Sequence, residues 1–145
     1  MVIQYNKKYF DDMCLFVKEN YDEDFYITEN NRRIIINNSY LLKGLLNSSN
    51  LVFISEENNI VNGILSVWAS CGSDIKRKYI KLLANEYIAD KLLTVLFWNS
   101  NEDFYIKINK NSEMINVLRR KGFEFFHDRG NELLLVRRNR QWITH

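Results

Sequence analysis

The feature that most constrains this fold is the order of hydrophobic patterns late in the chain. Residues 103–108 (DFYIKI) alternate apolar and polar side chains, as a strand with one buried face does. Residues 111–121 instead repeat their apolar side chains with the period of a helix. Gly122 is suited to the left-handed position that ends a helix, and Phe123 opens a new strand pattern. A strand, a helix and a strand in this order predict a crossover unit in a mixed α/β fold.

The rest of the chain extends this mixed pattern. Strand patterns occupy residues 2–5, 51–55, 60–69, 78–83, 123–127 and 133–137, and helix patterns occupy residues 7–21, 39–46 and 88–98. The letters EENN and DRGN form turns of hairpin length, and Asn38 or Ser39 is a helix cap. Residues 25–27 and 33–36 fit neither pattern clearly. The predicted order is β-α-α-β-β-β-α-β-α-β-β, an α/β (α+β) fold in one domain over residues 1–145.

Composition narrows the classes of function. The net charge of +2 is too close to balance to support nucleic-acid binding. No apolar run reaches the roughly 18 residues of a membrane span, and residues 1–13 lack the apolar core of a secretion signal. Cys14 and Cys71 fit no metal-ligand spacing, and their apolar surroundings predict buried thiols. We therefore expect a cytoplasmic protein without a metal. The asparagine-rich, proline-free composition favours an AT-rich genome, such as that of a phage or of a low-GC bacterium.

Two segments carry a resemblance to a known family. In residues 111–123, Asn111, Leu118, Gly122 and Phe123 are spaced as in a helix that ends in Leu-Tyr-x-x-x-Gly-Phe. In residues 60–68 (IVNGILSVW), Gly63 stands at the glycine of a characteristic strand. Together with the order of the elements, these segments resemble the GNAT family of N-acetyltransferases. The resemblance implies a mostly antiparallel central sheet flanked by helices, with the fourth and fifth strands splayed apart.

The resemblance also implies a place for acetyl-CoA. In this family the loop between the fourth strand and the third helix reads Gln/Arg-x-x-Gly-x-Gly/Ala, and its backbone N–H groups face the pyrophosphate. An ungapped alignment places Ala84, Tyr87 and Ala89 at the three motif positions, and only Ala89 agrees. A second alignment takes ANEY as the end of the strand and shortens the loop. The cofactor-binding residues that the resemblance implies are Leu82, Leu83, Ala84, Tyr87, Ile88, Ala89, Asp90 and Asn111.

The chemistry requires an acid for the thiolate and a base for the amine. The family tyrosine that can serve as the acid is replaced by Leu118, which donates no proton. Glu86, just past the fourth strand, is the candidate catalytic base for an amine acceptor. Asn111 would reach the CoA arm or cap its own helix. The aromatic residues are expected to lie mostly in the core, with Trp68 on the acceptor side: they are Trp68, Tyr79, Tyr87, Phe97 and Trp98.

Two functions stay open. The first is an enzyme that transfers acetyl from acetyl-CoA to an amine of a protein or small molecule. The second is a catalytically inactive GNAT-fold binding protein that no longer uses CoA, such as a phage, host-interaction or structural component, with a protein as its partner. The basic end of the chain, RRNR followed by Trp142, would then be a contact segment. The sequence also leaves open whether the chain is a homodimer.

Overall fold

The predicted hairpins and the crossover combine into one main sheet. The structure is a computed structural model that describes residues 1–70 and 76–139, so Cys71 and Trp142 lie outside the described residues. In those ranges the main sheet has seven strands in the order β1-β4-β5-β6-β7-β9-β8. They are β1 (Val2–Gln4), β4 (Leu51–Glu57), β5 (Ile60–Ala69), β6 (Lys78–Ala84), β7 (Phe104–Asn109), β8 (Glu124–Asp128) and β9 (Glu132–Arg137). Only β6 and β7 pair in parallel, which confirms the mostly antiparallel sheet.

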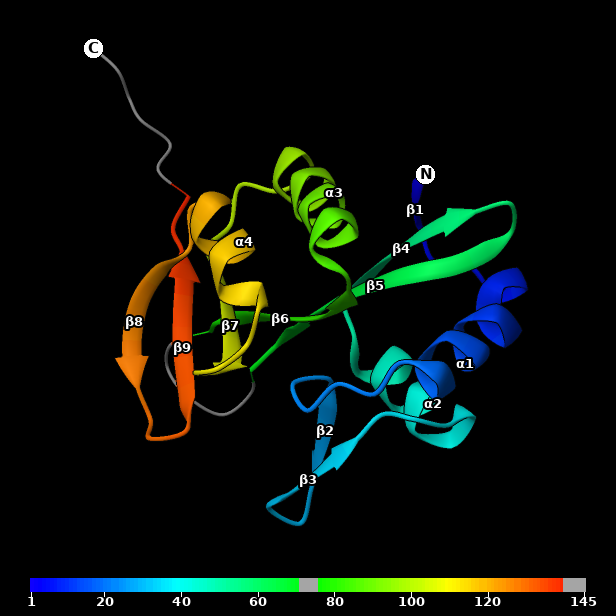
Figure 1. The fold of residues 1–145 in the computed structure, drawn as a ribbon, viewed down its shortest axis with the longest axis horizontal. Coiled ribbons are helices and arrows are strands. Elements are labelled where there is room, and N and C mark those ends of the chain that lie inside the picture. The colour runs from blue at the N-terminus through cyan, green and yellow to red at the C-terminus, as the bar shows by residue number, and fades with distance from the viewer. Residues whose placement is uncertain (71–75, 140–145) are drawn as a thin grey trace.

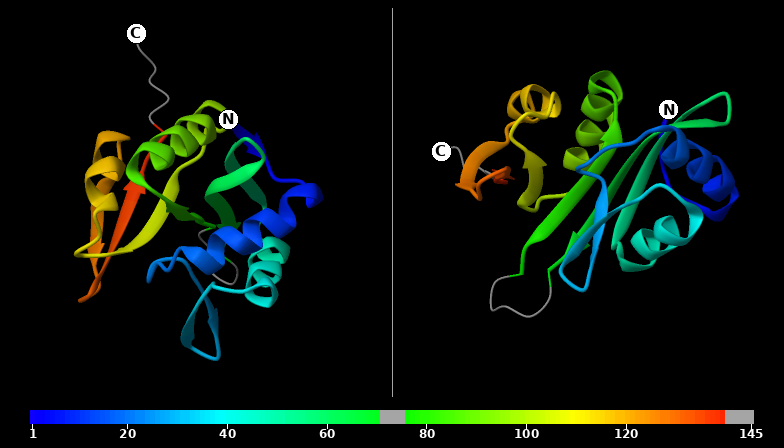
Figure 2. Two further views of the ribbon diagram at one scale, coloured as in Figure 1. Left: turned by 45° about the vertical axis from the view of Figure 1, so that its right-hand side comes forward. Right: turned by 60° about the horizontal axis from the view of Figure 1, so that its bottom comes forward.

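Helices cover both faces of this sheet (Figure 1). Helices α3 (Glu86–Trp98) and α4 (Met114–Arg120) lie on one face, over a core that includes Leu65, Leu92 and Ile106. On the other face lie the short η1 (Lys7–Tyr9), α1 (Phe10–Glu19) and α2 (Ser39–Ser48), over a core that includes Met13 and Ile64. Figure 2 shows a separate small hairpin, β2 (Tyr26–Glu29) and β3 (Arg32–Ile35), beside α2. The two segments that fitted neither pattern are therefore the strands of this hairpin.

The hairpin of β4 and β5 differs from the prediction at its turn. Glu56 and Glu57 belong to β4, so the turn consists of Asn58 and Asn59 alone. Both asparagines have positive φ, 52° and 65°, which is the conformation of a two-residue hairpin turn. Asparagine tolerates this conformation better than most residues, so the two asparagines favour this turn.

Gly63 lets helix α3 lie directly on β5. A Cβ at this position would lie 2.5 Å from Ile88 Cγ2 and 3.0 Å from Leu92 Cδ1. Such distances exclude any side chain without movement of the helix. Gly63 pairs with Ala84, the last residue of β6, so this close contact lies next to the start of α3. The glycine is therefore a packing requirement of the sheet beside the candidate site.

Helix α4 begins later than predicted, at Met114 rather than Asn111. Asn111 lies in the preceding turn and does not cap the helix. The hydroxyl of Ser112 accepts a hydrogen bond from the Met114 N–H at 3.1 Å. At the other end Gly122 has φ 96°, and the Phe123 N–H donates to the Leu118 carbonyl at 3.0 Å. This is the helix-ending geometry expected of the glycine.

Two aromatic residues predicted to lie in the core lie on the surface instead. Tyr87 is 67% exposed and Trp98 is 84% exposed, because both are on the outward side of α3. The inward side of that helix is formed by Ile88, Ala89, Leu92, Leu93 and Leu96. Tyr79 is buried as predicted. Cys14 is half-buried beside α2, so its thiol is less enclosed than its apolar neighbours suggested.

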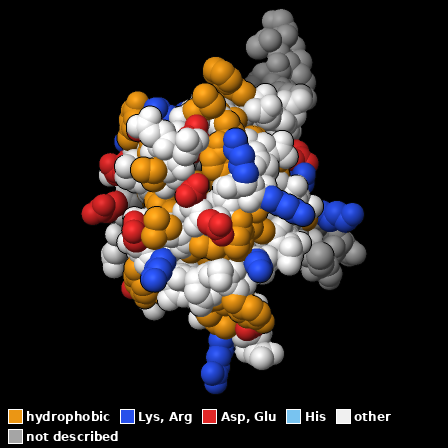
Figure 3. All heavy atoms as spheres, turned by 90° about the vertical axis from the view of Figure 1, so that its right-hand side faces the viewer, with side chains coloured by type: hydrophobic (Ala, Val, Ile, Leu, Met, Phe, Trp, Pro, Cys, Tyr) orange, Lys and Arg blue, Asp and Glu red, His pale blue; other side chains and the backbone are white. Residues whose placement is uncertain are grey.

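Charge is mixed over the face of the molecule that lies at the right of Figure 1. Figure 3 shows acidic and basic side chains interspersed there with small apolar patches, so this face has no field of one sign. Among the described residues, no helix combines the length and the apolar character needed to cross a membrane.

Candidate functional site

Strands β6 and β7 part from each other after a short paired segment. Their parallel pairing joins Lys78 to Phe104 and Tyr79 to Tyr105, and no later pair occurs in the described residues. Strand β6 nevertheless stays paired with β5 as far as Ala84, and β7 stays paired with β9 as far as Asn109. These are the fourth and fifth strands of the main sheet in chain order. The predicted splay between them is confirmed.

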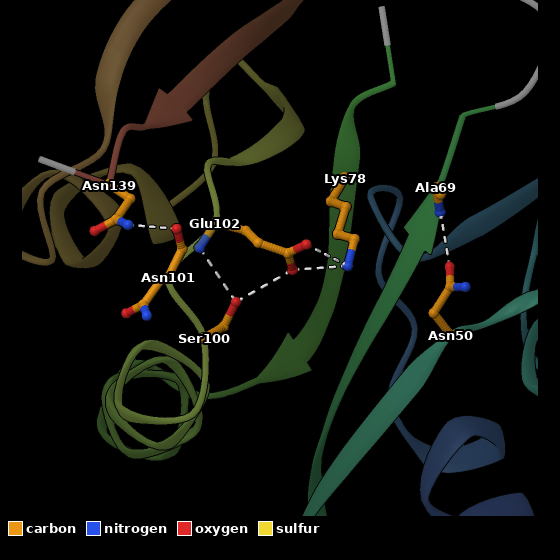
Figure 4. A network of polar contacts seen from close by, with 7 residues as sticks. All are labelled: Asn50, Ala69, Lys78, Ser100, Asn101, Glu102 and Asn139. Atoms are coloured by element: carbon orange, nitrogen blue, oxygen red, sulfur yellow. Dashed lines mark hydrogen bonds and ion pairs between the residues drawn. The ribbon is translucent and has the colours of Figure 1, made fainter. Parts of the chain in front are cut away.

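The paired ends of the two strands are held by polar and aromatic contacts. Figure 4 shows Lys78 of β6 forming an ion pair with Glu102, just before β7, at 2.7 Å. The Ser100 hydroxyl donates to the same carboxylate at 3.2 Å. The Tyr79 ring lies 5.7 Å from that of Tyr105. Because these contacts all lie at one end, the strands diverge only toward their carboxyl ends.

A narrow crevice lies between the diverging strands, with a volume of about 20 Å³. Part of its lining is apolar and includes Ile80, Leu82 and Met114. Four of the other lining residues are charged, namely Asp22, Asp24, Lys81 and Lys107. A wider hollow of about 530 Å³ at the start of α3 shares Asp22, Ser112 and Met114 with the crevice. The two spaces therefore meet along one continuous wall.

Helix α3 begins directly after β6, and Asn85 alone connects them. The helix starts two residues before the predicted Ile88. Asn85 caps it: the side-chain oxygen accepts from the Ile88 N–H at 2.9 Å, and the backbone oxygen accepts from the Ala89 N–H at 2.8 Å. In the described residues the N–H groups of Glu86 and Tyr87 have no acceptor. Two donors at the helix N-terminus are therefore available to an anion.

The wider hollow is acidic. Its lining includes the carboxylates of Asp22, Glu86 and Glu113 and no lysine or arginine. Asp90 lies one turn further along α3, and its carboxylate forms an ion pair with the Lys121 ammonium at 3.3 Å. The charge of Asp90 is therefore partly compensated, whereas a diphosphate in the hollow would meet the other three carboxylates.

The remaining predicted site residues lie on both sides of the sheet. Leu82 packs under α3, whereas Leu83 belongs to the core under α1 and α2. Ala84 ends β6 and lines the wider hollow. Asn111 lies on the far side of Ser112, next to the acidic loop that contains Asp22. Leu118 is completely buried.

The charged mouth of the crevice contains two groups with shifted pKa values. Burial, with the nearby ammonium of Lys107, lowers the pKa of Lys81 to about 8. Burial also raises the pKa of Asp24 to about 6, although the Asn109 N–H donates to its carboxylate at 2.9 Å. The Lys81 Nζ lies 4.0 Å from the centre of the Tyr26 ring and 5.8 Å from that of Trp68. Both groups therefore change charge near neutral pH.

A buried carboxylate ties the small hairpin to the sheet beside these groups. Glu132 of β9 is 6% exposed, and its Oε2 lies 2.9 Å from the Arg33 guanidinium. The Tyr26 hydroxyl donates to the same oxygen at 3.1 Å. Burial and the Glu132 charge raise the pKa of Tyr26 to about 12, so the hydroxyl keeps its proton. This contact holds the Tyr26 ring against Lys81.

Sequence reasoning pointed to Glu86 and the N-terminus of α3, which line the wider hollow, and did not single out Asp24, Lys81 and Lys107, which line the crevice. The two lysines did leave a signal. Each interrupts a strand of otherwise large apolar or aromatic residues, in YIKLL and in YIKIN. A lysine at the centre of such a strand is enclosed by its neighbours, and a functional role is a common reason to keep it there. Asp24 gave no comparable signal, because nothing in the sequence places residues 21–24 beside the end of β7.

Comparison with known proteins gives a clear result for the fold. No family model and no curated protein matches the sequence. Among solved structures, yncA of Salmonella typhimurium, solved with its cofactor acetyl-CoA, has a TM-score of 0.69 and 13% identity over 100% of this chain and 96% of that one. The ribosomal-protein-alanine N-acetyltransferase of Brucella melitensis has a TM-score of 0.68 and 15% identity over 94% and 96%. The GNAT-family acetyltransferase of Streptococcus pneumoniae has a TM-score of 0.65 and 12% identity over 94% of this chain and 97% of that one.

The chain has the GNAT fold. At these identities the likeness establishes the fold alone. The likeness covers nearly the full length of both chains in each comparison. The charged groups at the mouth of the crevice are side chains, and a likeness in fold does not establish side chains.

Proposed function

We propose that this chain transfers an acetyl group from acetyl-CoA to an amine. The observation that carries the proposal is the parting of β6 and β7 beyond Tyr79 and Tyr105, within a GNAT fold. Among residues 1–70 and 76–139, the edge of β6 that faces β7 has no strand partner there, so backbone groups between Ile80 and Ala84 are available to a ligand. The pantetheine amides would bind this edge, with the thioester in the crevice.

The pyrophosphate would bind at the N-terminus of α3. The free N–H groups of Glu86 and Tyr87 point out of the first turn, and the helix dipole favours an anion there. This anion site offers fewer than four N–H donors, because the N–H groups of Ile88 and Ala89 already donate to Asn85. Binding of the diphosphate by this chain would therefore depend strongly on two donors.

The acetyl transfer needs a base for the acceptor ammonium. In the reaction the base removes one proton from the ammonium, the nitrogen attacks the thioester carbon, the C–S bond breaks, and the second nitrogen proton passes to the departing CoA thiolate. Glu86 lines the outer hollow, whereas Asp24 lines the crevice itself. A carboxylate with a pKa of about 6 is ionised at neutral pH and is a stronger base than an ordinary one. We therefore propose Asp24 as the base, with Glu86 as the second candidate.

One observation favours a second function, a GNAT-fold binding protein that does not use CoA. The hollow at the start of α3 has three carboxylates and no basic side chain, and it lies where a diphosphate would have to bind. Such a lining repels an anion at close range. The two functions therefore differ in one measurable property, the affinity for acetyl-CoA.

The decisive experiment is a calorimetric titration with acetyl-CoA of the wild type and two variants of residue 86. Glu86→Ala removes the carboxylate and keeps the N–H, and Glu86→Pro removes both. Proline is well tolerated at the first position of a helix, and the extended Asn85 before it (φ −73°, ψ 170°) suits a following proline. We expect Glu86→Ala to bind at least as tightly as the wild type. Glu86→Pro should bind about tenfold or more weakly than Glu86→Ala, because one charge-assisted hydrogen bond is lost.

Turnover then separates the two candidate bases. Asp24→Asn should abolish acetylation of an amine and leave acetyl-CoA binding intact, whereas Glu86→Ala should retain activity if Asp24 is the base. The absence of acetyl-CoA binding by the wild type at millimolar concentration would refute acetyl transfer and favour the binding protein.

A further inference from the structure

The crevice between β6 and β7 holds charges of both signs that do not neutralise one another. Two carboxylates, Asp22 and Asp24, and two ammonium groups, Lys81 and Lys107, line the same small space. In the described part of the chain, neither lysine forms an ion pair or hydrogen bond with a carboxylate. They are close enough to interact, because Lys107 and Asp24 both influence the pKa of Lys81, as do Glu132 and Arg33. The ion pairs that the described residues form involve neither Lys81 nor Lys107.

Part of the bonding capacity of these groups is unused within the described residues. Asp24 uses one carboxylate oxygen to accept from the Asn109 N–H, at 2.9 Å. Asp22 uses one oxygen to accept from the Asp24 N–H, at 2.8 Å. The second oxygen of each is free within residues 1–70 and 76–139. Lys81 lies over the ring of Tyr26, and Lys107 lies 5.1 Å from the centre of the Tyr79 ring, so both ammonium groups contact aromatic faces instead of oxygen acceptors.

This arrangement is unfavourable without a ligand. A half-buried ammonium loses hydration, and a ring face replaces only part of it. Lys81 and Lys107 also repel each other. An anion between the two lysines would relieve both effects, and a cation beside Asp22 and Asp24 would do the same for the carboxylates. A single small molecule that carries both charges would satisfy all four groups.

We propose that the acceptor is a free α-amino acid, with its carboxylate between Lys81 and Lys107 and its amine beside Asp24. A peptide N-terminus or a simple amine lacks a carboxylate on the carbon that bears the amine, so it would leave the two lysines uncompensated. Lysine side chains are flexible, and their movement away from the rings would widen the crevice for the ligand. The proposal rests on the proposed function only for the acetyl transfer that follows. In that step Asp24 takes one proton of the ammonium, the new N–C bond forms, the C–S bond of the thioester breaks, and the second nitrogen proton passes to the CoA thiolate.

The test is direct binding, measured without acetyl-CoA. The full chain is titrated by calorimetry with each of the twenty protein amino acids, and the tightest of them is compared with its α-amide and with its decarboxylated amine. We expect the amide and the amine to bind about tenfold or more weakly, because each loses the charge-assisted bonds to the lysines. Equal affinity for the acid and its amide would overturn the proposal, and so would the absence of binding by every amino acid at millimolar concentration.

Variants show whether the lysines are responsible. Lys107→Met and Lys81→Met should remove the preference for the acid over the amide, and Lys43→Met, on the distant helix α2, should retain it. A preference that survives both crevice variants would contradict the assignment. Because no step uses acetyl-CoA, a chain that binds amino acids but not acetyl-CoA would refute acetyl transfer and support this inference. A chain that acetylates peptides but binds no free amino acid would do the reverse.

Discussion

Replacing Lys81 by methionine should stabilise the protein, because the lysine is a half-buried cation that forms no ion pair among the described residues. Burial, with Lys107 and Arg33, lowers the pKa of Lys81 from 10.5 to about 8, and the carboxylates of Glu132 and Asp24 oppose this shift only in part. Each pKa unit corresponds to about 1.4 kcal/mol, so keeping Lys81 protonated at neutral pH costs about 3 kcal/mol of folding free energy. Contact with the Tyr26 ring at 4.0 Å returns roughly 1 kcal/mol. Methionine keeps most of the aliphatic packing, so we expect a net gain of about 2 kcal/mol.

The lowered pKa of Lys81 also predicts how the stability gain of Lys81→Met depends on pH. Between pH 8 and 10.5 the unfolded chain keeps the proton of Lys81 and the folded chain has lost it, so the stability of the wild type rises over this window. Below pH 8 the full penalty is present, and above pH 10.5 it is absent. The advantage of Lys81→Met should therefore be constant from pH 6 to 7.5 and shrink as the pH approaches 10.5.

Urea unfolding followed by circular dichroism at several pH values measures this difference. For a chain of 145 residues, a gain of about 2 kcal/mol corresponds to a rise in Tm of roughly 6 °C. Lys78→Met is the matched control on the same strand. Lys78 has an acidic partner, Glu102, at 2.7 Å, so its loss should lower stability by about 1 kcal/mol or less. An advantage of Lys81→Met that is absent at pH 7, or that does not change with pH, would refute the argument that an unpaired ammonium is enclosed there.

Three further variants test the surroundings of the crevice. Gly63→Ala should lower the free energy of unfolding by about 1–3 kcal/mol in urea titrations, since its Cβ would lie 2.5 Å from Ile88 Cγ2, and an unchanged midpoint would show that α3 moves freely. Asn85→Ala should cost about 1 kcal/mol in the same assay through loss of the cap on α3, whereas Asn85→Asp should retain the cap. Asp24→Asn should raise the free energy of unfolding by about 1 kcal/mol at pH 7, after discounting for partial exposure, and should not change it at pH 3. The reason is that the raised pKa of Asp24 makes the wild type lose stability as the pH rises through about 6. A gain for Asp24→Asn that is equal at both pH values would contradict that assignment.

Much of the fold could be predicted from the sequence because local signals agree with tertiary ones. The alternation in residues 103–108, the helical period that follows and the glycine at position 122 all have local causes, and the structure confirms each of them. The splay of β6 from β7 followed from the family resemblance and not from any local pattern. Boundaries were less predictable: α3 starts at Glu86 because the Asn85 side chain caps it, and an asparagine after a strand suggests a loop equally well.

The charged part of the site could not be predicted, because it depends on contacts between distant segments. Asp24 reaches the crevice through the Asn109 N–H, a contact across 85 positions in the chain. The Tyr26 ring reaches Lys81 because its hydroxyl binds Glu132, across 106 positions. Neither contact has a periodicity or a spacing that a sequence shows. The apolar pattern of the strands could reveal an unusual lysine within a strand, but it could not reveal which groups surround that lysine.

The crevice and its chemistry have separate structural origins. Strand β6 is held by β5, and β7 is held by β9, so the strands would still diverge if every charged side chain at the mouth were replaced. The opening is thus a consequence of backbone pairing, which a shared fold preserves at low sequence identity. The four charges at the mouth are side-chain properties, and a half-buried ammonium such as that of Lys81 lowers stability. We therefore connect the enclosed ammonium of Lys81 with a ligand that binds to it. The affinity for a zwitterion tests this connection, whereas the affinity for acetyl-CoA tests acetyl transfer.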